Sequence, residues 1–401
     1  MSVKKEANDE KTIFCDVPCN SNGTFPRFNQ CRQCVRKSVS STASNPKTDI
    51  SPKTASEIVA LSFMKNSLNS NIEISETTPF YDLDGNITAY CVSFHLSQEP
   101  KGYVLISLLT SEDPIVEFSF EGPGLVDTIQ RSTQSKLSRT PTINSNFETS
   151  PIYYLGAGAL FLQDSSNSYL YDVVTKEQYS FSDIDSQYNS AALTVSPYSF
   201  SIADGILDWA NSSINTNSVY KITGFGNGSD YWLMTDLAGP TESVCAPTAA
   251  TNLMWYWGVQ RGHTWVLNSS KTGLALAKLI FGNMKHNMWT SSSLGTLDSA
   301  VRGAYVNYLS PKGKNYNTKI VTQNNYNSFV TALNDNCPIH TMLRASSSIT
   351  SSGHDVMAFG YGKSTAGTNY LFVMDGWYDY GRFVKFNYFP VIKGVKVWVG
   401  G

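Results

Sequence analysis

The sequence predicts a mixed α+β protein with two main structured units. Helix-type and strand-type hydrophobic patterns occur in separate blocks and do not alternate as they would in a parallel α/β sheet. A chain of 401 residues, 41% of them hydrophobic, is long enough for two or three domains. No sequence repeat with a period of roughly 20 to 50 residues is present, which argues against a solenoid or a propeller.

The net charge and the distribution of apolar residues argue against several classes of protein. Thirty Lys and Arg residues against 32 Asp and Glu residues give a net charge of −2, so the chain lacks the excess positive charge of a nucleic-acid binder. No run reaches the roughly 18 to 20 apolar residues of a membrane-spanning helix, and we therefore expect no transmembrane segment. The first residues are polar, and no signal peptide is visible among them.

The cysteine count is odd, and residues 1–50 contain four of the seven cysteines. At most six can form internal disulfides, so one thiol is left over. We predict that residues 1–50 form a Cys-rich head followed by a Ser/Thr/Pro linker. The spacing in this head fits a structural zinc site or two disulfides, and both interpretations stay open. These four residues are Cys15, Cys19, Cys31 and Cys34.

Residues 51–124 are predicted to form a compact α+β domain. Ser51-Pro52 is a helix start, and the apolar residues that follow recur at helical spacing over residues 52–68. Four strand-type runs come next, at 77–83, 87–96, 102–109 and 114–122. The first two runs are separated by Asp84-Gly85, which is a strong hairpin signal.

Residues 125–215 have weaker patterns. A hairpin is predicted within residues 153–174, and a short helix within 201–211. The polar stretch between them is where a linker or a processing site would be tolerated. We therefore interpret 125–215 as a linker or activation region with a hairpin.

Residues 216–401 are predicted to form the second main domain, in which helices precede an antiparallel sheet. The helix patterns and the strand patterns are assigned from hydrophobic spacing. Helices are expected within 246–259, 293–309 and 326–335, and strands within 337–346, 354–362, 369–377, 382–389 and 395–400.

Cys245 is the candidate nucleophile. Thr241, Glu242 and Ser243 are expected to supply capping groups, and Pro247 suits the first turn of a helix. Cys245 would then lie at the amino end of an apolar helix, where the helix dipole and the unpaired N–H groups favour a thiolate. The alternative is a small buried core cysteine.

His354 is the candidate general base. A thiol nucleophile needs a base, and Gly353-His354 begins an apolar strand after a Ser/Thr-rich loop, which places the ring at the rim of a sheet. The adjacent Asp355 would point to the opposite face of the strand. The chain has five histidines, which are His95, His263, His286, His340 and His354.

Asp375 is the candidate group that orients His354. If the strand that begins at His354 pairs with the strand that ends near Trp377, these two residues face each other. Asp375 is then the diagonal neighbour of His354 on the same face, within roughly 7 to 8 Å between Cβ atoms. The backbone N–H of Cys245 is one expected oxyanion donor, and Trp377 and Gly353 are further candidates for substrate or oxyanion binding.

These residues carry a resemblance to a known family. The segments CAPTAATNLMWYW, GHDVMAFGYG and VMDGWYDYGRFVKF, in this order, resemble the Cys, His and post-His motifs of streptopain-like cysteine peptidases. That family belongs to the papain-like superfamily, next to the bacteriocin-leader peptidase group. The first domain, from ASEIVALSF to PIVEFSFEG, resembles the propeptide of the same family. The two resemblances cover most of residues 52–401.

The resemblance implies a papain-like catalytic domain, with a helical part and an antiparallel sheet, preceded by a small α+β prodomain. It implies a zymogen whose prodomain acts as an intramolecular inhibitor, with peptides or proteins as substrates and no cofactor for catalysis. Cys245 matches the nucleophile and His354 the base. Family members typically carry Asn-Trp-Gly-Trp where this chain has Met374-Asp375-Gly376-Trp377, so Asp375 takes the place of an asparagine.

Other interpretations stay open at this point. The resemblance implies a secreted or cell-surface protein, whereas the lack of a visible signal peptide allows a cytoplasmic location. The four-cysteine head is not part of the family pattern, which favours a binding or adhesion protein on a decayed peptidase fold. An acyltransferase could use the same site. No zinc-protease, serine-hydrolase or P-loop motif is present.

Overall fold

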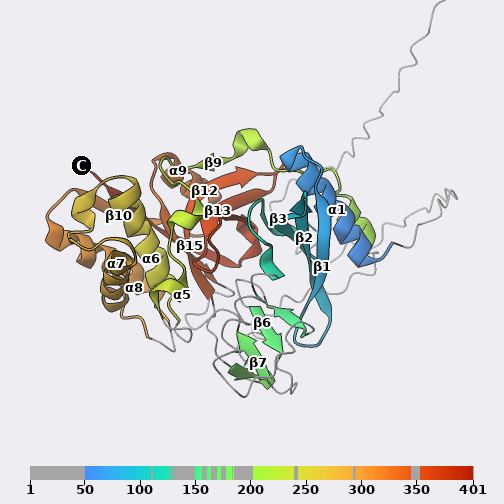
Figure 1. Cartoon of the computed structure of the whole chain (residues 1–401), viewed down its shortest axis with the longest axis horizontal. Helices are drawn as coiled ribbons and strands as arrows, with labels where there is room; N and C mark the ends of the chain where they lie inside the picture. Colours follow the sequence, from blue (N-terminus) through green and yellow to red (C-terminus); the bar gives the residue numbers. More distant parts are fainter. Residues whose placement is uncertain are drawn as a thin grey trace, which may run out of the picture. The chain divides into compact units, whose positions relative to one another are not determined.

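The computed structural model describes most of the chain beyond residue 49. The described residues are 50–109, 112–126, 129, 150–155, 160–163, 169–172, 178–182, 184, 202–238, 243–291, 295–344 and 353–400. Residues Ile50–Gly401 form one compact unit, which Figure 1 shows. The predicted Cys-rich head lies outside the described residues.

The N-terminal unit, as we call α1 and β1–β4, contains the predicted helix and the four predicted strands. Ser51 begins α1 because its Oγ accepts the backbone N–H of Thr54 at 3.1 Å. Gly85 turns the first hairpin at φ +81°, a conformation that glycine adopts without strain. The bounds are α1 (Pro52–Leu68), β1 (Glu73–Tyr81), β2 (Ile87–Leu96), β3 (Glu99–Ser107) and β4 (Ile115–Ser119).

A group of short strands follows the N-terminal unit. The predicted hairpin is present, since β6 pairs with β7 in antiparallel register. The bounds are β5 (Ile152–Tyr154), β6 (Leu160–Gln163), β7 (Tyr169–Asp172) and β8 (Gln178–Ser180).

The C-terminal unit, as we call residues 202–400, contains the predicted helices and the predicted antiparallel strands. Its helices are α4 (Ile202–Leu207), α5 (Met234–Leu237), α6 (Cys245–Trp255), α7 (Gly273–Asn287), α8 (Asp298–Leu309) and α9 (Tyr326–Asn334). Its strands are β9 (Tyr220–Lys221), β10 (Tyr316–Val321), β11 (Ile339–Arg344), β12 (Gly353–Lys363), β13 (Asn369–Met374), β14 (Arg382–Lys385) and β15 (Val391–Val399).

The mixed α+β class is confirmed, but several elements of the C-terminal unit were not predicted. These are the short elements α5 and β9, the longer helix α7 and the edge strand β10. His286 lies in the last turn of α7. No helix in the described part of the chain is long and apolar enough to cross a membrane.

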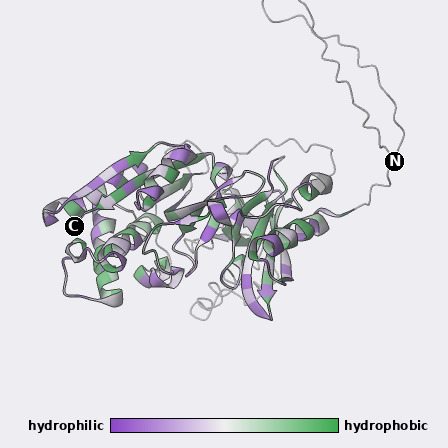
Figure 2. Cartoon of the chain, turned by 90° about the horizontal axis from the view of Figure 1, so that it is seen from above, coloured by the Kyte–Doolittle hydropathy of each residue, from purple (hydrophilic) through white to green (hydrophobic). Residues whose placement is uncertain are grey.

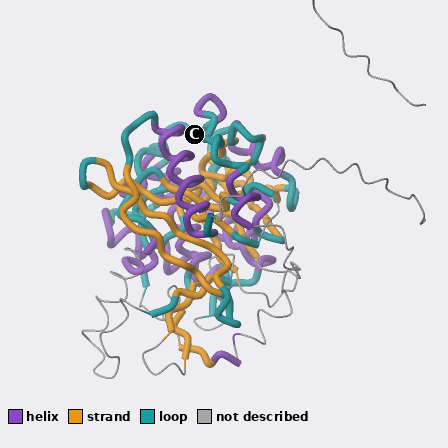
Figure 3. Tube along the Cα trace, turned by 90° about the vertical axis from the view of Figure 1, so that its right-hand side faces the viewer, coloured by secondary structure: helices purple, strands orange, loops and turns teal. Residues whose placement is uncertain are grey.

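One sheet runs through both units. Its order is β10-β15-β11-β12-β13-β14-β4-β3-β2-β1-β5-β6-β7-β8, and the short strand β9 pairs with β12. The two units meet where β4 pairs with β14, through Phe118 opposite Phe383 and Glu117 opposite Val384. Figure 3 shows the strands in orange with helical segments beside them.

The pairing of β12 with β13 has the predicted register near the candidate site. Met357 lies opposite Met374 and Ala358 opposite Val373, which is the alignment that places His354 across from Trp377. The register shifts by one residue farther along, between Ala358 and Gly360. Hydrophobic residues of the helices and strands alternate with hydrophilic ones, as Figure 2 shows, because each element turns one face to the core.

Candidate active site

Cys245 is the first residue of α6, as the sequence predicts. The expected side-chain cap is wrong for Ser243, because the residue that precedes the helix is Val244 and no side chain caps the helix there. Thr241 and Glu242 lie outside the described residues. Helix α6 packs on β12, which brings its first turn to the strand that carries His354.

The thiol of Cys245 lies beside the peptide group that follows His354. The residue is half-buried, and the backbone N–H groups of Asp355 and Ala246 lie near its sulfur and favour the thiolate. Burial, aided by the Asp355 carboxylate, raises the pKa of Cys245 to about 12, although these N–H groups and the Arg344 guanidinium oppose the rise. At neutral pH the residue is therefore a neutral thiol in this structure.

His354 is oriented by a backbone carbonyl. Its side chain is buried, with 2% exposure, and its Nε2 lies 2.8 Å from the carbonyl oxygen of Asp375. A carbonyl only accepts hydrogen bonds, so Nε2 carries the proton and Nδ1 keeps the free lone pair of a base. The ring stacks on Trp377 with 3.9 Å between ring centroids. Burial and the nearby Arg382 lower the pKa of His354 to about 3.

The role expected of the Asp375 side chain needs correction. Its carboxylate does not contact His354 but accepts the backbone N–H of Trp377 at 2.8 Å and that of Tyr378 at 3.2 Å. It also forms an ion pair with Arg382 Nη2 at 2.9 Å. Two N–H donors and a guanidinium hold the carboxylate more strongly than one neutral ring would. The side chain thus closes the turn that directs the Asp375 carbonyl toward His354.

The turn after Asp375 depends on glycine. Gly376 has φ +78°, and its carbonyl accepts the backbone N–H of Met234 at 2.8 Å, which ties the turn to α5. Burial raises the pKa of Asp375, although Arg382 opposes this shift. Trp377 leaves its indole Nε1 buried without a hydrogen-bond partner within the described residues. The Trp377 indole thus holds a hydrogen-bond donor that the described residues leave unused.

Gly353 is the exposed first residue of β12 and pairs with Arg344. A Cβ at this position would collide with the Leu343 carbonyl and with the Arg344 side chain. The glycine therefore lets β12 begin beside Arg344, close to the candidate base.

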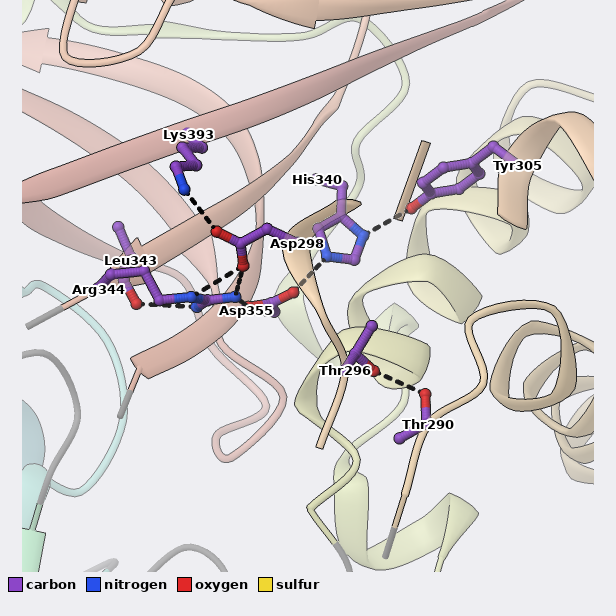
Figure 4. A network of polar contacts seen from close by, with 9 residues as sticks. All are labelled: Thr290, Thr296, Asp298, Tyr305, His340, Leu343, Arg344, Asp355 and Lys393. Carbon is purple, nitrogen blue, oxygen red and sulfur yellow. Dashed lines mark hydrogen bonds and ion pairs between the residues drawn. The ribbon is translucent and has the colours of Figure 1, made fainter. Parts of the chain in front are cut away.

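A second polar network on the other face of β12 was missed by the sequence analysis. Asp355 Oδ2 lies 2.9 Å from His340 Nε2, and Tyr305 OH lies 2.9 Å from His340 Nδ1 (Figure 4). Asp355 Oδ1 forms an ion pair with Arg344 Nη2 at 2.6 Å. Despite burial, Arg344 and His340 lower the pKa of Asp355 to about 2. Asp355 thus points away from His354, as predicted, but it lies close to Cys245.

The network continues to the start of α8. Arg344 Nη2 is 2.7 Å from Asp298 Oδ1, and Lys393 Nζ is 2.8 Å from Asp298 Oδ2 (Figure 4). Burial would lower the pKa of Arg344, but Asp355 and Asp298 raise it, so the guanidinium stays charged. Alternation along β11 and β12, once these strands are paired, could have placed His340 and Asp355 on one face, whereas no local signal connects Arg344 with Cys245.

No cluster of His, Cys, Asp or Glu able to hold a metal ion occurs among the residues that the structure describes. The head that contains Cys15, Cys19, Cys31 and Cys34 lies outside them, so zinc or disulfide bonding there stays a prediction. Cys337 and Cys245 are free thiols within the described part of the chain.

Residues 230–392 match the family model described as the Peptidase_C39 like family. The chain is similar to cysteine peptidases. The matched segment includes Cys245, His354 and Asp375, and the match supports a cysteine-type peptidase, a hydrolase, of the papain-like kind. No curated protein matches the chain.

Proposed function

We propose that the chain is a cysteine endopeptidase in which Cys245 is the nucleophile and His354 is the general base. The observation that carries this proposal is the packing of α6, whose first residue is Cys245, on β12, whose second residue is His354. It places a thiol at a helix start beside an oriented imidazole, within the segment that matches a cysteine peptidase family.

The proposed reaction follows from the tautomer of His354. Nδ1 takes the proton of the Cys245 thiol, and the sulfur attacks the carbonyl carbon of the scissile peptide. The backbone N–H of Cys245 and the indole N–H of Trp377 are the proposed donors to the oxyanion. The imidazolium then gives its proton to the leaving amine. Water, deprotonated by Nδ1, hydrolyses the thioester and restores the thiol.

We also propose that the chain is a secreted or cell-surface precursor, of the streptopain-like kind. The neutral thiol and the neutral imidazole support the precursor part of this proposal, because both groups are held uncharged by burial and the reactive thiolate is scarce. In this proposal the N-terminal unit inhibits the site only while the chain is uncut, and cleavage between residues 180 and 215 relieves the inhibition by increasing the access of water to the site.

A non-catalytic binding protein is the second candidate. The raised pKa of Cys245 favours it, since a thiol of this kind reacts poorly. The two candidates differ after cleavage between residues 180 and 215. A precursor should then show Cys245 reacting with iodoacetamide well below pH 8.5, roughly the usual thiol pKa, whereas a binding protein should show no such gain.

The proposal is tested with Cys245→Ala and His354→Ala. Each should lower hydrolysis of a fluorogenic peptide and self-processing, followed by mass spectrometry, by at least about 1,000-fold, because the nucleophile and the base act as a unit. Cys337→Ala and His95→Ala are matched controls outside the site and should keep activity. Full activity in either site variant would contradict the proposal.

A further inference from the structure

The junction between β4 and β14 is held by buried polar contacts as well as by backbone pairing. Ser119 Oγ donates to the carbonyl of Gly381 at 2.9 Å, and Lys385 Nζ donates to the carbonyl of Asp113 at 2.8 Å. These residues are buried. A buried donor without its partner is costly, so each contact opposes separation of the two units.

Aromatic rings from both units fill the same junction. Phe118 of β4 stacks on Phe383 of β14, with 4.8 Å between ring centroids. Phe118 also contacts Tyr370 of β13 at 5.1 Å and Phe63 of α1 at 4.7 Å, both edge to face. All four rings are buried and belong to one core cluster. Loss of the N-terminal unit would expose this aromatic surface to water.

The junction also carries a buried ion pair that leads to the active site. Glu117 of β4 lies 2.5 Å from Arg382 Nη1, and Tyr103 of β3 donates its hydroxyl to the same carboxylate. The other terminal nitrogen of Arg382 holds the Asp375 carboxylate. Glu117 and Arg382 are almost fully buried, with 7% and 5% of their side chains exposed. Without Glu117, the charge of Arg382 would be only partly compensated.

The N-terminal unit also packs against the residues that follow the Asp375 turn, next to His354. Tyr378 and Tyr380, which follow the Asp375 turn, belong to a second core cluster with Tyr103 and Val116 of the N-terminal unit. Trp377, whose ring stacks on His354, packs against this cluster. The N-terminal unit therefore contacts the residues that follow the Asp375 turn.

We propose that Arg382 is a positioning residue for His354 and that Glu117 holds it in place, so that the N-terminal unit remains a bound, working part of the peptidase after the chain is cleaved. This proposal rests on the proposed function. Glu117 fixes Arg382, Arg382 fixes the Asp375 carboxylate, and the Asp375 turn presents its carbonyl to His354. Activation by cleavage then changes access to the site without expelling β1–β4.

The first experiment tests whether the N-terminal unit stays bound. A recognition site for a sequence-specific protease is inserted within residues 185–200 of the full chain carrying Cys245→Ala, which prevents self-processing. After cleavage, the two fragments should elute together from size-exclusion chromatography at micromolar concentration, in equal amounts. Separate elution of two folded fragments would overturn the proposal.

The second experiment tests positioning in the cut enzyme with native Cys245. Reactive sites are first counted by titration with a thiol-alkylating inhibitor, so that kcat refers to competent molecules. Glu117→Gln and Arg382→Gln should each lower kcat per site by about 10- to 100-fold, as expected for a misplaced base, with little change in KM. Arg382→Lys, which keeps the charge, should recover part of the loss.

Glu112→Gln is the matched control. This exposed carboxylate lies at the same junction, 3.8 Å from Lys385 Nζ, and its loss should leave kcat unchanged. If Glu117→Gln reduces only the number of titratable sites and leaves kcat per site unchanged, its role is structural and the positioning proposal is wrong.

The outcomes also separate this inference from the proposed function. If residues 202–401 cleave peptides at the full rate after the N-terminal unit has been removed, the proposed function holds and this inference fails. If the native chain cleaves no peptide, the proposed function fails. The inference then stands only if the fragments stay together and Glu117→Gln changes the rate of Cys245 alkylation while Glu112→Gln does not.

Discussion

His354 shows how a single contact determines the chemistry of a residue. Its spacing from Trp377 was predicted from the sequence, because hairpin register follows from the alternation of apolar residues. The sequence predicted a contact between His354 and the Asp375 carboxylate, whereas in the structure His354 faces the Asp375 backbone carbonyl. The Asp375 carboxylate pairs with the buried Arg382, seven residues farther along the chain, and the Asp375 carbonyl is left to face the imidazole. The spacing of residues in the sequence does not reveal that Arg382 competes with His354 for the Asp375 carboxylate.

The low pKa of His354 gives the uncut chain a specific pH dependence. The ring is neutral in the folded state down to about pH 3, whereas in the unfolded chain it protonates near its ordinary pKa of about 6.5. The unfolded state binds more protons between these values, so stability is lost as the pH falls from about 6.5 toward 3. The charged groups that affect the ring are Arg382, Arg344 and Asp355.

We therefore expect the native chain to lose about 2 kcal/mol more stability than the His354→Gln variant between pH 6.5 and pH 5. Urea unfolding of both chains at several pH values measures this difference. Equal slopes of unfolding free energy against pH in the two chains would show that His354 is not buried as a neutral ring.

At the scale of elements, signals at helix ends and strand alternation account for what was predicted. Helix α1 has a serine cap and a proline, and its start was predicted at the right residue. Helix α7 begins at Gly273 without a side-chain cap and without an acid in its first turn, so the usual start signals are missing. Strand β10 is an edge strand with exposed Lys319 and Ile320, and it lacks a clear apolar alternation.

The pairing of β11 with β12 brings two opposite charges to Cys245. Arg344 at the end of β11 lowers the pKa of Cys245, and Asp355 on β12 raises it. Removing either partner leaves the other charge buried, and each change should cost about 3 kcal/mol or more of folding stability.

The two changes should have opposite effects on the thiol. Arg344→Gln should slow the alkylation of Cys245 by iodoacetamide at pH 8, and Asp355→Asn should accelerate it, each by about 3- to 10-fold. The rates are measured by mass spectrometry on the folded full chain. Unfolding would accelerate both reactions, so acceleration in both variants would contradict the electrostatic explanation.

At the scale of the whole molecule, the sequence predicted two units but not their union in one sheet. The contact between Glu117 and Arg382 joins positions 265 residues apart. In the sequence, the segments that form β4 and β14 show only the pattern of a strand, and neither identifies the other as its partner. Local patterns identify strands, whereas the choice of partner at this distance depends on how the buried rings fit together. The shared core implies that both units unfold together.

Tryptophan fluorescence can test this cooperative unfolding. All eight tryptophans lie after residue 202, so their emission reports on the C-terminal unit. Phe118→Ala, in β4, removes a ring from the shared core and should cost about 3 to 5 kcal/mol. It should therefore lower the midpoint of the fluorescence-detected thermal transition by several degrees, although the substitution lies in the other unit.

Phe161→Ala is the matched control, because Phe161 is as well buried as Phe118 but belongs to a small cluster formed by β5–β8 and the residues around them. It should move the fluorescence transition much less than Phe118→Ala. Circular dichroism in the far ultraviolet follows both units at once. If Phe118→Ala splits the dichroism transition in two and leaves the fluorescence midpoint unchanged, the units unfold independently. The junction would then be too weak to keep β1–β4 attached to the site.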